Sequence, residues 1–393
     1  MALSLIQQPA LHQPAFNPTN FVLSSSNSAT AGFRYKVDLL VNGVNEAEFF
    51  FNPRADGRLW FNPERIIQSF LPITPKFANG VTTSIVRHEN YLTYKIDVTE
   101  FIAGASGATY SGDTRYANAI AMPMLDFQLG TFNNYYMDGT GGRKFQTNRQ
   151  NIYIPTLYRW SLDFITELID GSTSEVDKIR IIPYNSSGAM TAIDIANGVQ
   201  GNGNVGNAYL RVVVGFQFRS VPSDATRFEV TALNAANEAV SNTITFFRDD
   251  TCEREGLNAS LFYLNRLGGW DALQFKANPT FETNVERKQV SRILGSMGSS
   301  GYEYDRYEHQ QVNYENKYDE NLTLRSQFLN DEESEAMQEL LTSPQVYFIP
   351  ENSAAIPCVI TSGSRERRYR VRDGLFAGEI DIRLAFDNFT QRL

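Results

Sequence analysis

The chain has 393 residues, an apolar content of 42% and a formal net charge of −9. This apolar content excludes a disordered chain and suggests two or three domains. The acidic balance argues against nonspecific binding to nucleic acid, which needs a basic surface. No run of about 18 apolar residues is present, so no membrane span is expected.

The first residues, "MALSLIQQPALHQP", have no basic segment followed by a long apolar run. We therefore expect no secretory signal, and synthesis in a bacterial cytoplasm. Of the two cysteines, Cys252 and Cys358, each is expected to be a buried free thiol, although a disulfide between them stays open.

Residues 1–30 are predicted to be an irregular, extended N-terminal arm. The segment contains "QQPALHQPAFNPTNF" and the polar stretch "SSSNSATAG". Prolines hold such a segment extended and remove donors from a strand ladder. The arm is expected to lie on a neighbouring subunit, where Leu11, Phe16 and Phe21 would be buried.

Residues 31–165 are predicted to form a β-rich domain with long loops. "FRYKVDLLV" at 33–41 alternates apolar and polar residues, and "NG" at 42–43 indicates a turn. "FNPERIIQSFLP" predicts a short helix capped by Asn62, with Pro63 first and Pro72 after its end. A strand follows at 90–102, and the Gly-, Asn- and Tyr-rich residues 103–150 are expected to be loops.

Residues 166–277 are predicted to form a β-sandwich-like domain, because strand patterns recur at short intervals. The Gly/Asn tract at 195–208 is expected to be a flexible loop. The predicted strands are "KIRIIPY", "YLRVVVGFQF", "RFEVTAL", "TITFF" and "SLFYLNRL".

Residues 278–393 are predicted to form an α+β C-terminal domain with one helix. "GYEYDRYEHQQVNYENKYDENLTLRSQF" is typical of long polar-faced strands or an extended hairpin. The helix is predicted at 331–342, with Asn330 and Glu333 at capping-box spacing and an apolar stripe through Met337 and Leu340. The strands "QVYFIP", "IPCVIT" and "GEIDIRLAF" follow. The fold class is thus mainly β, with two or three sandwich-like domains and few short helices.

No catalytic, metal or cofactor residue is assigned from the sequence. His12, His88 and His309 lack metal-ligand spacing, and no phosphate loop or nucleophile elbow appears. "GNGNVG" at 201–206 has the spacing of a dinucleotide loop but lies among turn formers, so a flexible loop is favoured.

A glycosidase carboxylate pair stays open on the sequence alone, because carboxylates are plentiful. Asp138, Asp163, Asp271 and Glu282 are the candidates, although a turn or surface role is favoured for each. "RERRYRVR" at 365–372 could contact phosphate, but a polar strand face or a patch that meets acidic neighbours is favoured.

"FYLNRLGGWDALQF" at 262–275 places two glycines between two strand-like halves. Gly268 and Gly269 predict a type I′ hairpin turn with positive φ at both positions, and Trp270 packed at its root. The alternative is a sugar-binding site made by Trp270 and Asp271.

This stretch also carries a resemblance. "LNRLGGWDALQF" resembles an L-N-x-x-G-G-(W/F)-D-x-x-x-F signature of tail structural proteins from phages that infect Bacteroidetes, including crAss-like phages. The resemblance implies a virion tail subunit and brings no catalytic residues. Three other pieces are similar in style, namely "QPAFNPTNFVLSSSN", "FRYKVDLLVNG" and "SQFLNDEESEAMQELLTSPQVYFI…IPCVIT". The last of these resembles the end domains of tail hub or baseplate-type proteins.

Three functions are compared on these grounds. The favoured one is a structural subunit of a phage tail (ring, hub or adaptor). Its expected partners in the virion are copies of itself, in a homo-oligomeric ring, and other tail proteins. The second is a carbohydrate-binding module that uses Trp60, Trp160 or Trp270, although Trp60 and Trp160 lie in apolar contexts that suit cores. The third is a glycan-cleaving tail enzyme.

Overall fold

The computed structural model is mostly β. It describes residues 3–389 apart from 74–83, 89–90, 129–130, 155–160, 169–174, 198–205, 214–221, 223, 249–258, 276, 304, 351–354, 363–375 and 387.

The chain divides into two compact units, and the division does not follow a single cut. Unit 1 contains Met1–Thr251 together with Leu264–Asp271, and unit 2 contains Cys252–Tyr263 and Ala272–Leu393. A short segment of the later chain therefore belongs to the earlier unit. The limits expected from the sequence after residues 165 and 277 stay predictions.

Two sheets of unit 1 enclose a first core. The predicted strand at 33–41 is confirmed: Phe33, Tyr35 and Val37 face inward, and residues between them face outward. Asn42 and Gly43 both have positive φ and form the predicted turn. The first sheet has three strands, in the order β1 (Leu3–Gln7), β3 (Phe21–Ser25) and β6 (Arg58–Phe61). The second has six, in the order β2 (His12–Pro14), β10 (Arg115–Asn118), β8 (Tyr91–Ile102), β4 (Phe33–Val41) and β5 (Val44–Phe51), and its sixth strand, β9 (Ala105–Ser111), also pairs with β8.

The expectation of an irregular arm over residues 1–30 is wrong. β1 pairs antiparallel with β3, and β2 pairs parallel with β10. Phe21 is 1% exposed in the core of its own subunit, whereas Leu11 and Phe16 are both 41% exposed. The prolines interrupt the segment between strands and do not prevent pairing.

The other local expectations in this domain are partly confirmed. Helix α1 (Glu64–Phe70) is present, but the expectation that Asn62 caps it and Pro63 is its first residue is wrong, because Pro63 is the N-cap. Asn62 lies one position earlier, where its Oδ1 atom accepts a hydrogen bond of 3.1 Å from the Glu64 N–H. The expectation of loops throughout 103–150 is wrong at its start, because β9 and β10 lie there. The remainder contains only η1 (Thr131–Tyr135) and β11 (Tyr136–Met137) among the described residues.

Two further sheets of unit 1 enclose a second core, which includes Phe145, Phe164, Val230 and Phe246. The predicted strands in this region are confirmed where the structure describes them, and residues 214–218 of the pattern at 209–218 lie outside the described residues. The expected loop at 195–208 is wrong at both ends, which belong to β16 and β17. One sheet has four strands, in the order β11, β13 (Ser161–Leu168), β17 (Gly206–Val213) and β7 (Ser84–His88). The other has six, in the order β12 (Asn151–Ile154), β19 (Ile244–Arg248), β18 (Arg227–Leu233), β14 (Lys178–Asn185) and β15 (Gly188–Ala189), and its sixth strand, β16 (Ile193–Ala196), also pairs with β14.

Unit 2 is an eight-stranded sheet covered by helix α2 (Asp331–Thr342), which has the predicted bounds. Asn330 and Glu333 form the predicted capping box, with bonds of 2.8 and 3.0 Å. Met337 packs so closely on the sheet that a Cβ at Gly378 would lie 2.5 Å from its Cε atom. The sheet runs β21 (Trp270–Phe275), β20 (Ala259–Leu264), β26 (Val346–Ile349), β27 (Ile356–Ile360), β28 (Phe376–Leu384), β25 (Gln311–Leu329) and β22 (Ala277–Ser291), with β29 (Asn388–Phe389) on β25.

Cys358 lies in this second unit's core as a free thiol, as expected. Burial raises the pKa of its thiol to about 12, so the group stays protonated and unreactive at neutral pH. Cys252 lies outside the described residues.

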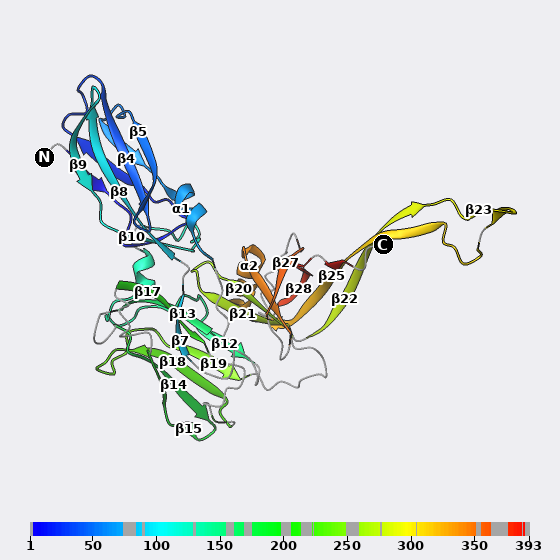
Figure 1. Cartoon of the computed structure of the whole chain (residues 1–393). Helices are drawn as coiled ribbons and strands as arrows, with labels where there is room; N and C mark the ends of the chain where they lie inside the picture. Colours follow the sequence, from blue (N-terminus) through cyan, green and yellow to red (C-terminus); the bar gives the residue numbers. More distant parts are fainter. Residues whose placement is uncertain are drawn as a thin grey trace. The chain divides into compact units, whose positions relative to one another are not determined.

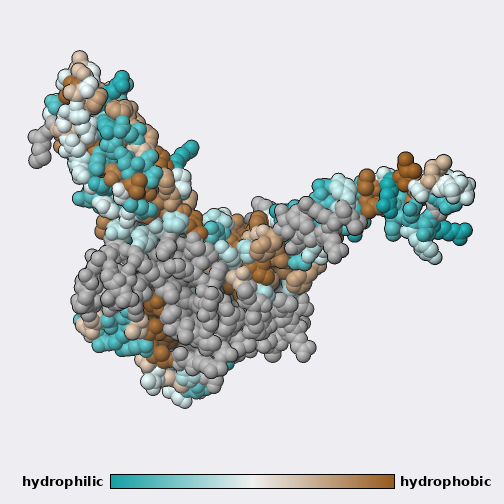
Figure 2. Space-filling view, viewed as in Figure 1, coloured by the Kyte–Doolittle hydropathy of each residue, from teal (hydrophilic) through white to brown (hydrophobic). Residues whose placement is uncertain are grey.

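The predicted extended hairpin is present in unit 2. β22 and β25 pair from Ala277 to Ser291, and a small sheet of β23 (Ser296–Gly298) and β24 (Gly301–Glu303) continues them. Figure 1 shows these strands leaving the rest of the sheet as a two-stranded projection. Figure 2 shows apolar side chains among polar ones along it.

Candidate functional site

The Gly-Gly-Trp-Asp segment forms the turn between β20 and β21. The Asn265 N–H donates to the Gly269 carbonyl at 2.8 Å, and the Gly268 N–H donates to the Asn265 carbonyl at 3.1 Å. Gly268 has a φ of +78°, whereas Gly269 is not in the left-handed region. The loop is thus a three-residue turn closed by a left-handed glycine, and the predicted two-residue type I′ turn is wrong.

The side chain of Asn265 organises this turn. Its Oδ1 atom accepts hydrogen bonds of 2.9 Å from the N–H groups of both Leu267 and Gly269. Its Nδ2 atom donates to the Gln146 carbonyl and to the Asp271 carboxylate, at 2.8 Å each. One buried amide therefore uses both of its ends to fix the backbone of the turn and to hold it against another segment.

Two further elements of unit 1 hold the same turn. The Gln146 Nε2 atom donates to the Leu267 carbonyl at 2.8 Å, and the Asp163 carboxylate on β13 accepts from the Trp270 N–H. The Thr147 hydroxyl donates to Asp271 at 3.2 Å. We call the set Gln146, Thr147, Asp163, Asn265 and Asp271 the clasp; all five side chains are buried.

Both glycines are required by the space around them. A Cβ at Gly268 would lie 2.6 Å from the Ile120 Cγ1 atom, and one at Gly269 would lie 2.4 Å from the Gln146 carbonyl oxygen. Gly268 therefore meets two demands, a left-handed backbone and close packing. At Gly269 a glycine is required for one reason, which is the close approach of the Gln146 backbone.

The clasp has the properties of a structural joint. Trp270 is 1% exposed, so its ring offers no face to a sugar. Asp163 and Asp271, two of the candidate carboxylates, both bind the turn: Asp163 accepts a hydrogen bond from the Trp270 N–H, and Asp271 accepts one from the Asn265 side chain. Their observed role is to satisfy donors that the turn leaves buried.

The other two candidate carboxylates lie apart from the clasp. Asp138 is held by Arg143 through two hydrogen bonds. Burial alone would raise the pKa of the Asp138 carboxyl, but the bonds from Arg143 and Thr140 outweigh burial and lower it. Glu282 is exposed on β22 in unit 2 and faces Asn321 across the strand pair.

The remaining tryptophans differ from expectation or lie outside the described residues. Trp60 on β6 is 49% exposed, so the expectation that it suits a core is wrong. The Arg54 guanidinium lies 4.5 Å from the centre of its ring. Trp160 is not among the described residues, and neither are the arginine-rich segment 365–372 and positions 201–205 of the Gly/Asn tract.

Within the described ranges, no group of three His, Cys, Asp or Glu side chains could hold a metal ion. His12 is buried and stacks between Tyr116 and Tyr136, with ring centres 5.0 and 4.4 Å away. No helix in the described part of the chain is long and apolar enough to cross a membrane.

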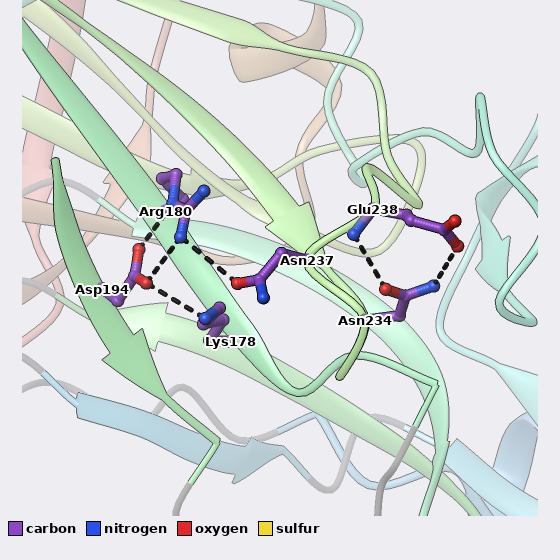
Figure 3. Close-up of polar contacts among 6 residues, drawn as sticks. All are labelled: Lys178, Arg180, Asp194, Asn234, Asn237 and Glu238. Carbon is purple, nitrogen blue, oxygen red and sulfur yellow. Dashed lines mark hydrogen bonds and ion pairs between the residues drawn. The ribbon is translucent and has the colours of Figure 1, made fainter.

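A second polar cluster lies on the surface of the second core (Figure 3). Asp194 on β16 receives a bidentate contact from Arg180 on β14, at 2.7 and 2.8 Å, and an ion pair from Lys178 at 3.1 Å. The hydrogen bond from Arg180 lowers the pKa of Asp194 to about 2, with a further contribution from Lys178. The charges of these three residues meet across adjacent strands, so the cluster fixes β16 to β14.

The partners of the turn were not found from the sequence. Gln146 and Asp163 lie more than 100 positions before the residues that they bind, in segments with no pattern that links them to the glycines. The only available signal was the fixed spacing of Asn265, Gly268, Gly269 and Asp271, each of which now has a role in one turn.

The comparisons with known proteins add no assignment: no protein-family model matches the chain, and no curated protein matches it.

Proposed function

We propose that the chain is a structural subunit of a bacteriophage tail, of the ring, hub or adaptor type. In this proposal it assembles with copies of itself and with other tail proteins in the virion. The proposal starts from the resemblance of residues 264–275 to tail-protein sequences. It is supported by the clasp, in which the residues of that signature build a joint within the subunit.

The projection made by β22–β25 is the observation that carries the proposal. Its far end exposes large apolar side chains, with Ile293 at 89%, Met297 at 80% and Tyr307 at 88%. A two-stranded hairpin is marginally stable in water, and apolar groups gathered on it mark a surface that another protein covers. Such a projection suits a subunit that works by contact with its neighbours.

The test is the composition of virions. Antibodies raised against the recombinant chain should label the tail of the purified phage that encodes it, and mass spectrometry of those particles should find the chain in several copies. Absence from purified virions, with the chain present in infected cells, would refute a structural role.

A carbohydrate-binding module is the second candidate, and the exposure of Trp60 is the observation that favours it. A tryptophan with an open face can stack on a sugar, but Arg54 lies over this ring. Binding to soluble glycans that is lost in Trp60→Ala would support the module. Release of reducing ends by the wild-type chain would instead indicate a glycan-cleaving enzyme.

A further inference from the structure

Along the outer part of the β22–β25 projection, no described strand pairs with the outer edge of either strand. We call residues 287–316 the ribbon. β22 is the last strand of its sheet, so its outer edge has no neighbour among the described strands. β28 and β29 pair with β25 from Lys317 onward, which leaves the edge of Gln311–Glu315 equally open within the described part of the sheet.

The outgoing and returning segments of the ribbon carry opposite formal charge. The outgoing strand, at 287–293, has Arg287, Lys288 and Arg292 and no acid. The returning segment, at 301–316, has four acids and one arginine: Glu303, Asp305, Glu308, Glu315 and Arg306. Of these residues, Glu315 lies on β25, opposite Lys288. The ribbon as a whole has no net formal charge, which disfavours a polyanion or a charged lipid surface as its partner.

The register makes identical ribbons complementary side by side. Lys288 lies opposite Glu315 in the same ribbon, with an Nζ to Oε1 distance of 3.2 Å. If a second ribbon is placed in register against the open β22 edge, its Glu315 comes next to this Lys288 at about the 4.7–4.9 Å spacing of strands. Lysine and glutamate then alternate from strand to strand across the joined ribbons.

Two residues along β22 from Lys288, an apolar cross-strand pair would also be repeated from one copy to the next. Val290 lies opposite Val312, and Val290 is half exposed. Placing ribbons side by side sets the Val290 of one copy beside the Val312 of the next, so each contact buries an apolar pair and extends an ion-pair row. Since β22 and β25 are antiparallel, every new strand contact is antiparallel as well.

We propose that the ribbon is a self-assembly edge, on which the β22 edge of one copy pairs with the β25 edge of a second copy of this chain. The two surfaces differ, so the contact is head to tail, and it closes into a ring when the rotation per copy divides a full turn. Tyr314 has no counterpart in β22 and forms a bulge. Bulges curve a sheet, as a closed ring of ribbons requires.

This inference deepens the proposed function, since it names the chain itself as the partner in the ring. The test uses the full-length chain, with its size measured by mass photometry and light scattering over a concentration series. Lys288→Glu and Glu315→Lys each place like charges both within a ribbon and between copies. Each variant alone should require at least about tenfold more protein to assemble than wild type.

Mixing the two variants separates repulsion within one ribbon from repulsion between copies. In an equimolar mixture, the carboxylate introduced by Lys288→Glu meets the lysine introduced by Glu315→Lys on the neighbouring copy, so assembly should return although each ribbon keeps its internal repulsion. The double variant Lys288→Glu/Glu315→Lys should assemble as wild type does. Rescue by the double variant without rescue by the mixture would show that the pair acts only within one chain, and would overturn the proposal.

A matched control comes from the same strand. Arg325 and Glu379 pair at 3.2 Å between β25 and β28, where no edge is open. Arg325→Glu should leave assembly unchanged, and the circular dichroism of all variants should match wild type. A wild-type chain that stays monomeric at every concentration would also overturn the proposal.

The outcomes distinguish this inference from the proposed function. A chain found in virion tails whose mixed variants do not assemble keeps its tail role and loses the self-pairing edge. A chain absent from virions whose mixed variants do assemble keeps the edge and loses the tail role.

Discussion

Two hairpins follow one another in the chain and end in opposite surroundings. The turn between β20 and β21 is buried in unit 1, where the clasp satisfies its backbone. The β22–β25 hairpin ends in exposed apolar side chains. Both contain glycines and aromatic residues, so these residue types do not by themselves indicate a joint or a docking surface.

The difference lies in what fills the space around each turn. At Gly268 a Cβ would meet Ile120, whereas at Gly301, which also has positive φ, nothing lies within 4 Å. The first turn is fixed by contacts from distant segments. At the second turn no distant segment approaches Gly301, and Ile293, Met297 and Tyr307 near it are exposed.

The largest expected effect is at Trp270. Trp270→Ala should destabilise the fold by about 3–5 kcal/mol, because it empties a fully buried site beside the clasp. Tyr307→Ala, at the exposed end of the other hairpin, should stay within about 0.5 kcal/mol. Urea unfolding followed by circular dichroism measures both. Equal, small effects would show that the buried turn contributes no more to stability than the exposed one.

The sequence predicted the elements in which local pattern and long-range structure agree. Alternation located β4, β8 and β14, and the Asn330–Glu333 capping box located α2. It did not predict β1 to β3, because a strand with prolines near it is recognised only through its partner. Nor did it predict that Trp60, on a short strand of a small sheet, faces outward.

The clasp shows the same limit more sharply. The sequence showed a turn at Gly268–Gly269, but the reason for a glycine at 269 is the approach of Gln146, which lies far away in the chain. No local rule relates such segments. The glycine pair was therefore recognisable as a turn before it was recognisable as a joint.

The two glycine turns can be compared directly. Gly268→Ala should cost about 1–2 kcal/mol for the left-handed backbone and about 1–3 kcal/mol more for overpacking against Ile120. Gly301→Ala has only the first of these costs, and its local strain should barely alter global unfolding. The same urea titration measures the difference. A Gly268→Ala chain as stable as Gly301→Ala would show that the approach of Ile120 is easily relieved.

Asn265 tests the polar part of the clasp. Asn265→Ala leaves the N–H groups of Leu267 and Gly269 buried without this acceptor, so a loss of about 1–3 kcal/mol is expected. Asn284→Ala, on an exposed position of β22, should be nearly neutral. Hydrogen exchange should show the loss at the amides of 265–271 first. Unchanged protection there would mean that backbone bonds alone hold the turn.

The smallest effect is expected where unit 1 uses exposed ion pairs in place of buried bonds. Arg180 and Lys178 hold the pKa of Asp194 at about 2, below its ordinary value of 3.8. A carboxyl whose pKa is lowered by folding stabilises the native state above its unfolded pKa, and this contribution disappears as pH falls toward 2. Because the Asp194 side chain is 34% exposed, solvent screening limits the contribution to at most about 1 kcal/mol.

Asp194→Asn should therefore be less stable than wild type at pH 6, and the stabilities of the two proteins should converge between pH 4 and pH 2, about the range set by these two pKa values. A difference that persists at pH 2 would show that the substitution acts through packing of β16 on β14. The Asp194 charge would then contribute nothing measurable, which would sharpen the contrast with the buried clasp.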